Sequence, residues 1–287
     1  MPARLFLSRS GMFLHRSLTR PIKEGKREPL MKYHIDTIPV WDAFKQHKHC
    51  PLCALKYKVE MTDVDRCLGG SVMEPDTRIQ VNEKGFCARH QVLLYNQRNR
   101  LGHALMMHTH LKKSHSQLTP MFQEAEKAAK ACAGASITKK LTGNRDAKAA
   151  LRDAAQKILQ HTKSCLLCDS IEENMSRYMY TLMHLYKTDT AFRTAFREAD
   201  GLCVPDGAKL LEMAADHLSG ELLTQFANDL AALMDRSLTK LEGDLEWFTL
   251  KFDYRNQDKP WGDSKGSLER TANKLRTYCI GEEPVQE

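Results

Sequence analysis

The feature that most constrains the fold of this chain is a cysteine pattern that occurs twice. The motif CPLC at Cys50–Cys53 is followed by Cys87, and the motif CLLC at Cys165–Cys168 is followed by Cys203. The two motifs begin 115 residues apart, and Cys87 and Cys203 are 116 residues apart. Self-similarity at a nearly fixed offset indicates two copies of one structural unit, so we expect a pseudo-duplicated protein.

The first copy carries a complete set of metal ligands. A Cys-x-x-Cys pair places two thiolates on one turn, and two further ligands at the start of a helix complete the tetrahedron that zinc prefers. His90 follows Cys87 by three residues, which puts both on one face of a helical turn. We therefore expect one zinc ion to be bound by Cys50, Cys53, Cys87 and His90.

The second copy offers Cys165, Cys168 and Cys203, but Asp206 stands where the first copy has His90. A carboxylate can bind zinc, so we expect a second zinc site of Cys₃Asp composition. This site carries one more negative charge than a Cys₃His site and needs nearby cations or solvent. The alternative is that this copy has lost its metal and keeps its thiols as small buried side chains.

Other chemistries of paired cysteines are weighed against zinc. An iron–sulfur cluster could use the same ligands and is the less favoured cofactor. A redox dithiol is typical of a βαβ setting, which is not expected here, and covalent haem needs a His after the motif, where Ala54 and Asp169 stand. Four protein ligands close the coordination sphere, so both sites are predicted to be structural. We expect Cys67, Cys132 and Cys279 to be ordinary thiols.

Most of the chain shows helical periodicity. Apolar residues from Leu222 to Phe252 recur every three or four positions, which predicts one long amphipathic helix. The glycines and Pro75 between Gly69 and Gly85, with the alternation Ile79 and Val81, favour a loop or small hairpin. The fold class is therefore predicted to be all-α with little strand. Further helices are expected over 171–185, around Phe192 and Phe196, and over 124–133 and 147–160, with a break at Gly143-Asn144.

Composition limits the function classes. The chain has 43 basic and 36 acidic residues, a net charge of +7, but its first 30 residues alone contribute +5. The rest is nearly neutral, so nucleic-acid binding is not expected, and no apolar run is long enough to span a membrane. We expect residues 1–30 to be an extension before a start at Met31. The predicted units are a first repeat over 31–115, a helical connector over 116–162 and a second repeat over 163–287.

Two further groups of residues are candidate sites. His103, His108, His110 and His115 lie on one predicted helix, where solvated histidines are commoner than a metal site. The segment 253–264 gathers Asp253, Arg255, Asp258 and Trp261 after the long helix, which suggests a surface for a ligand or partner. The alternative is a loop that folds back, with Trp261 buried and Arg255 paired to an aspartate. Nucleotide, dinucleotide, hydrolase and zincin motifs are absent from the sequence.

Several segments resemble those of an uncharacterised bacterial family, a domain of unknown function. The resemblance implies a cytosolic bacterial protein and supplies no activity; it also leads us to expect His where Asp206 stands. Relatives of this family are sometimes labelled substrate-binding components of transporters. We do not adopt that label for this chain, because no signal peptide or lipid-attachment cysteine lies near its start. The segments are 31–40, 50–53, 73–76, 81–90, 165–168 and 247–262.

These observations predict a soluble, cytoplasmic, zinc-binding interaction or regulatory module rather than an enzyme. A partner protein is expected without being identified, and the oligomeric state is not specified. The rival hypothesis is an enzyme that uses the paired cysteines in redox chemistry or the 253–264 loop in substrate binding.

Overall fold

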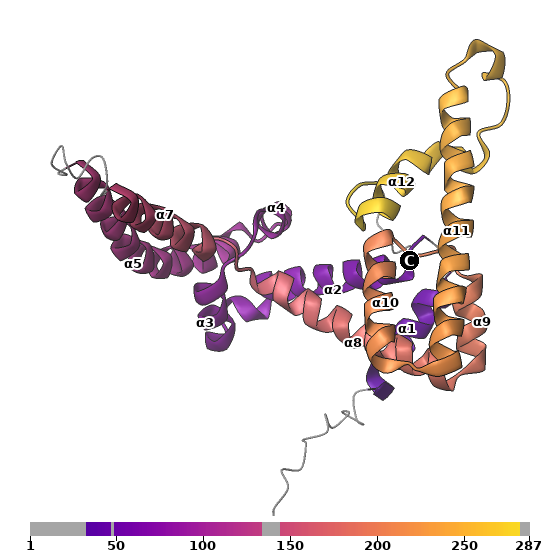
Figure 1. The fold of residues 1–287 in the computed structure, drawn as a ribbon, viewed down its shortest axis with the longest axis horizontal. Helices are drawn as coiled ribbons and strands as arrows, with labels where there is room; N and C mark the ends of the chain where they lie inside the picture. Colours follow the sequence, from indigo (N-terminus) through magenta and orange to yellow (C-terminus); the bar gives the residue numbers. More distant parts are fainter. Residues whose placement is uncertain (1–32, 47–48, 134–143, 282–287) are drawn as a thin grey trace, which may run out of the picture. The chain divides into compact units, whose positions relative to one another are not determined.

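A computed structural model describes residues 33–46, 49–133 and 144–281 of the chain. Within these ranges the secondary structure is helical and contains no strand (Figure 1), which confirms the predicted all-α class. The residues from Tyr33 onward belong to one compact unit. The helices are α1 Tyr33–Lys45, α2 Pro51–Leu68, α3 Pro75–Lys84, α4 Ala88–Asn96, α5 Arg100–Ala133, α7 Asn144–His161, α8 Leu166–Thr188, α9 Thr190–Glu198, α10 Val204–His217, α11 Gly220–Leu250 and α12 Ser267–Arg276, with short 3₁₀ segments at Gly70–Val72, Tyr254–Asn256 and Gly262–Gly266.

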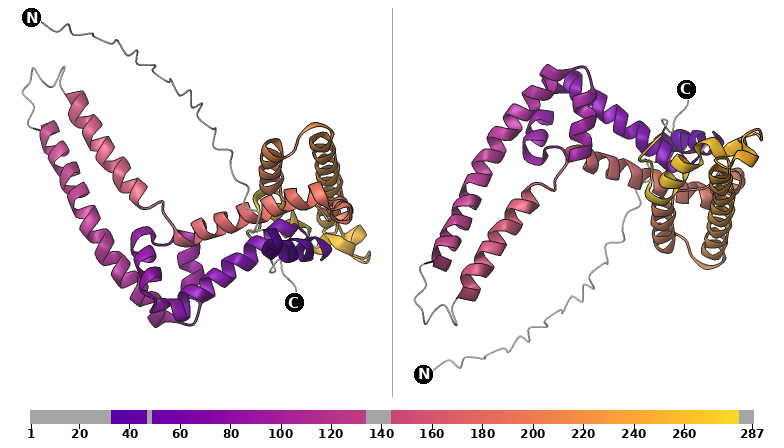
Figure 2. Two further views of the ribbon diagram at one scale, coloured as in Figure 1. Left: turned by 90° about the horizontal axis from the view of Figure 1, so that it is seen from below. Right: turned by 90° about the horizontal axis from the view of Figure 1, so that it is seen from above.

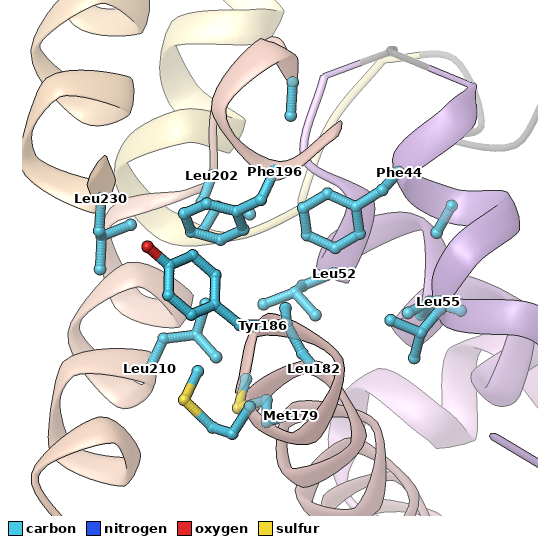
Figure 3. Packing of buried hydrophobic residues seen from close by; sticks show 14 of the residues in the cluster. Phe44, Leu52, Leu55, Met179, Leu182, Tyr186, Phe196, Leu202, Leu210 and Leu230 are labelled. Atoms are coloured by element: carbon cyan, nitrogen blue, oxygen red, sulfur yellow. The ribbon is translucent and has the colours of Figure 1, made fainter. Parts of the chain in front are cut away.

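The main core lies around the C-terminal half of α8. Tyr186 is fully buried there and packs edge-on against Phe196 and Phe226, at centroid distances of 5.6 and 4.9 Å. Figure 3 shows side chains from α1, α2, α9, α10 and α11 meeting the same face of α8. The Tyr186 hydroxyl donates to Asp229 at 2.6 Å, so its polar atom is satisfied within this apolar packing.

Helices α2 and α8 pack against each other in opposite directions. Leu52, near the start of α2, lies in the main core with Leu182 from the second half of α8. Cys67, at the end of α2, lies in a second apolar cluster with Leu167 from the start of α8. Each helix therefore begins near the end of the other, which places their first turns far apart.

Helices α5 and α7 form a long antiparallel pair (Figure 2). The helix predicted over 124–133 lies within α5, which begins 24 residues earlier, and the helix predicted over 147–160 lies within α7. Asn144 is the first residue of α7, whereas Gly143 lies outside the described residues. The long helix predicted from Leu222 is also present, since α11 runs from Gly220 to Leu250 and buries Phe226, Leu230 and Leu241 on one face.

The predicted loop or hairpin over Gly69–Gly85 is wrong. A 3₁₀ turn and the helix α3 occupy this segment instead. Pro75 does not interrupt a helix but begins one, where its missing N–H has no intrahelical partner to lose. Ile79 is exposed and Val81 is buried, and this two-residue alternation was too short to separate a strand from a helix.

Candidate metal centres

The eight predicted metal ligands lie in two clusters, but the partners are exchanged relative to the prediction. Within each cluster the ligand atoms all lie within 4.8 Å of one another. The expectation that each copy would supply all ligands of its own site is therefore wrong. Site A consists of Cys87, His90, Cys165 and Cys168, and site B consists of Cys50, Cys53, Cys203 and Asp206.

The antiparallel packing of α2 and α8 explains the exchange. The two CxxC motifs form the first turns of these helices, and α2 has 18 residues, so that it is about 27 Å long. The two CxxC turns are therefore far apart. The turn that starts α2 meets Cys203 and Asp206, and the turn that starts α8 meets Cys87 and His90. The local geometry is the same in both: Cys50 and Cys165 precede the first helical residue, and each sulfur accepts from the backbone N–H three residues later.

The remaining ligands also come from matched helix starts. Cys87 and Cys203 precede α4 and α10 with similar extended backbones, φ −71° for both. Two residues before each of them stands a glycine with positive φ, 60° for Gly85 and 120° for Gly201. Close approach enforces glycine here, because a Cβ on Gly201 would lie 2.2 Å from Ser237 Oγ. All four ligand motifs thus lie at helix N-termini, whose partial positive charge favours thiolates.

The distances in site A are short and nearly uniform. His90 Nδ1 lies 3.3, 3.2 and 3.5 Å from the sulfurs of Cys87, Cys165 and Cys168. The sulfurs of Cys87 and Cys168 are 3.7 Å apart. Four potential ligands therefore surround one point, and the arrangement could hold a single metal ion.

Glu60 orients the histidine of site A. The buried carboxylate of Glu60 lies 3.1 Å from His90 Nε2 and accepts two bonds of 2.7 Å from Arg89. A carboxylate only accepts, so Nε2 carries a proton and Nδ1 is the nitrogen left to bind a metal. Burial would lower the pKa of His90, but Cys165 and Glu60 raise it to about 10, so a metal would displace the proton from Nδ1. Burial would raise the pKa of Glu60, but Arg89 and His90 outweigh it and hold this pKa at about 2.

The thiols of site A differ in exposure and acidity. Burial would raise the pKa of Cys165, but its contact with His90 dominates and lowers this pKa to about 6. Burial and the neighbouring Cys165 raise the pKa of Cys168 to about 12, although Cys168 is the exposed one of the pair. Cys165, the more acidic thiol, is only 3% exposed. Cys168, the accessible thiol, ionises less readily than an ordinary cysteine.

Site B is more deeply buried than site A. Cys50, Cys53, Cys203 and Asp206 are each at most 5% exposed. Asp206 Oδ2 lies 3.0 Å from the sulfur of Cys203 and 3.9 Å from that of Cys53. Burial, followed by the charge of Cys50, raises the pKa of Asp206, as expected for a carboxylate among thiols.

Cations surround the extra negative charge of site B. Lys274 on α12 is 8% exposed, and its burial lowers the pKa of its ammonium. The charges of Cys50, Cys203 and Cys53 act in the other direction and raise this pKa. The positive charges of Lys56 and Lys209 lower the pKa of the Asp206 carboxylate, against the larger effect of its burial. The neutralising groups that a Cys₃Asp site requires are thus present.

The other sequence candidates do not converge on a site. His103 contacts the side chain of Gln91, and His110 contacts the carbonyl of Asn82. Among the described residues neither histidine belongs to a cluster of potential metal ligands. No sequence pattern indicates Glu60 or Lys274, because each is a single charged residue within an ordinary helix.

The 253–264 segment packs on the end of α11. Arg255 pairs with Asp253 at 2.5 Å, and Asp258 is exposed. Trp261 is half-buried, with its ring 5.7 Å from that of Phe248. The segment is arranged by Lys251, which is 4% exposed and donates to the carbonyls of Asn256, Gln257 and Lys259. The predicted ligand or partner role of this segment stays a prediction.

Comparison with known proteins places the chain by its match to a family model. The sequence model of a family described as a family of unknown function (DUF6062) matches residues 31–282. No curated protein and no solved structure shows significant similarity to the chain. In the part of the chain that the structure describes, no helix has the length and apolar character required to cross a membrane.

Proposed function

The chain belongs to this family of unknown function, whose membership supplies no activity, and we propose from its residues that it is a zinc protein with two structural metal sites. The observation that carries the proposal is the exchanged pairing of the ligand motifs. Each zinc ion would join a CxxC turn of one half to a helix start of the other half. The two ions would fix α2 and α8 in one relative position and hold a rigid surface for a partner protein.

The geometry of site A supports zinc. In a tetrahedron with Zn–S bonds of about 2.3 Å and Zn–N bonds of about 2.0 Å, two sulfurs are about 3.8 Å apart and a nitrogen and a sulfur about 3.5 Å apart. The corresponding separations in site A are 3.7 Å and 3.2–3.5 Å. In a four-iron cluster each thiolate binds a different iron, which requires wider spacing, so a single metal ion is favoured.

A structural role is favoured over a catalytic one at both sites. Each site offers four protein ligands, which leave no open position for water or substrate. The Glu60 contact fixes the His90 ring in the manner of a carboxylate–histidine–metal arrangement. All four ligands of site B are buried, and this limits exchange with solvent.

Thiol redox chemistry is the second candidate function, and the thiol environments argue against it. A redox dithiol needs an accessible cysteine that is also acidic. In the pair Cys165 and Cys168 these two properties fall on different residues. We therefore infer that the low pKa of Cys165 serves metal binding, which requires a thiolate.

Zinc counting in cysteine variants tests the proposal. The chain purified without chelator should contain two zinc ions, and Cys87→Ser and Cys203→Ser should each lose one. Two double variants distinguish the pairings. With exchanged partners, Cys53→Ser with Cys87→Ser should lose both ions, whereas Cys87→Ser with Cys168→Ser should lose only one.

Cys279→Ser is the matched control, because Cys279 is exposed and belongs to neither site. It should retain both ions. Elemental analysis that finds no metal, or iron in place of zinc, would refute the proposal. Loss of only one ion from the Cys53→Ser and Cys87→Ser double variant would instead refute the exchanged pairing.

A further inference from the structure

A cavity of about 500 Å³ lies beside site B, between α11 and α12. Cys50 and Cys53 form part of its wall, and Leu241 and Ile280 add apolar surface. Cys50 and Cys53 therefore belong both to the cavity wall and to site B.

One end of the cavity carries a buried cation, Lys274, on which the thiols of site B and Asp200 act only through their charge. Lys274 lines the wall, is 8% exposed, and makes no hydrogen bond or ion pair with any described residue. Its Nζ atom and Ser237 Oγ both lie near Gly201, since a Cβ built on that glycine would be 2.9 Å from the first and 2.2 Å from the second. An ammonium and a hydroxyl of the same wall are therefore close together, a combination suited to a carboxylate.

The cavity wall also carries unpaired carboxylates. Glu269 lines the wall, and its Oε2 atom is buried without a partner in the described structure. Asp200 also lines the wall and forms no ion pair within the described ranges. The wall also carries Lys240, paired with Asp263 at 3.1 Å, and Arg270, paired with Asp244 at 3.0 Å. The Nε atom of Arg270 is buried and has no hydrogen-bond partner in the described structure.

This distribution of charge selects the class of ligand. An anion would satisfy Lys274 but would lie close to the carboxylates of Glu269 and Asp200. A cation would satisfy Glu269 but would face Lys274. We propose that the cavity binds a small zwitterion of the amino-acid or short-peptide class, with its carboxylate on Lys274 and Ser237 and its ammonium toward Glu269 and Asp200.

The proposal goes beyond the two zinc sites and rests on the side chains of the cavity wall alone. The probes are L-leucine and glycyl-L-leucine, which share the two charged groups at different separations. Binding to the full chain with both metal sites loaded is measured by calorimetry. 4-Methylpentanoate and 3-methylbutylamine, which each keep one charged group, should bind about tenfold more weakly or worse.

The variants Lys274→Met and Glu269→Gln should each weaken binding of the better probe about tenfold. Glu269 is not a ligand of site B, so its variant separates the cavity from the metal site. Lys265→Met is the matched control, since Lys265 is exposed and lies outside the cavity, and it should bind as the wild type does.

Binding of leucine alone would indicate a free amino acid, and binding of the dipeptide alone would indicate a peptide; either supports the proposal. Failure of both probes to bind, equal binding of the singly charged analogues, or wild-type binding by both cavity variants would overturn it. Zinc content is measured on the same samples. Two zinc ions without probe binding overturn only the cavity, whereas probe binding without zinc overturns only the proposed function.

Discussion

The sulfur atoms of Cys87 and Cys168 lie 3.7 Å apart although 81 residues separate them in the sequence. Cys168 is exposed and Cys87 is half-buried, whereas the three cysteines of site B are buried. The two sites therefore differ in access from solvent although their ligands are alike.

The difference in exposure predicts the order of thiol modification. In the zinc-loaded protein, Cys279 should react first with iodoacetamide, because it is exposed and outside both sites. After chelation Cys168 and Cys87 should follow, and Cys50, Cys53 and Cys203 should react last. Mass spectrometry of peptides over a time course measures the order, and equal rates for the two sites would contradict this prediction.

Glu60 should control the affinity of site A alone. The variant Glu60→Gln removes the charge that holds the proton on His90 Nε2, and we expect zinc affinity at site A to fall by about tenfold to hundredfold. Site B should be unaffected, since none of its ligands contacts Glu60. Competition with a colorimetric chelator measures both affinities. Glu74→Gln, an exposed residue before α3, is the control, and an equal loss in that variant would exclude a specific role of Glu60.

Tyr186→Phe should lower the free energy of unfolding by about 1 kcal/mol at neutral pH, because the bond to Asp229 is lost within the core. Burial and Asp229 raise the pKa of Tyr186 above its usual value of 10.0. The stabilisation is therefore fully present below that value and is lost as the pH rises above it. Urea unfolding at increasing pH should show the difference between variant and wild type shrinking above pH 10.0. The exposed Tyr254→Phe variant should show no such change.

Lys251→Met should release the segment after α11. Its ammonium donates to three carbonyls, and the buried oxygens left behind would cost about 2 kcal/mol locally. Hydrogen exchange should accelerate over residues 252–261 while the main core stays protected. Lys265→Met is the control, because Lys265 is exposed and lies beyond the segment; unchanged exchange in Lys251→Met would show that Lys251 does not order the segment.

The sequence was sufficient to predict which residues cluster as potential metal ligands but not which of them lie together. Cysteine spacing predicts a turn and a helix start, which are local features, and all four motifs have that form. Which CxxC meets which helix start depends on how α2 packs on α8, and an apolar face carries no direction. The antiparallel arrangement exchanges the partners, and no local pattern of Cys87 or Cys165 records this.

The number of buried turns decided whether a helix could be predicted, as α11 and α3 show. The stripe of α11 spans many turns, so that periodicity decides the structure, and the long helix is confirmed. In α3 only Val81 is buried, and Pro75 is compatible with both a loop and a helix start. Glu60 and Lys274 could not be predicted, because their importance comes from neighbours that are distant in sequence.

The exchanged sites also impose an order on events during synthesis. When the chain has been made as far as His90, it contains two ligands of each site and all four ligands of neither. Site A becomes complete only once Cys168 has emerged, and site B waits for Asp206. The first CxxC motif therefore stays without its partner residues until Cys203 and Asp206 have been made, whereas Cys87 and His90 wait only for Cys165 and Cys168.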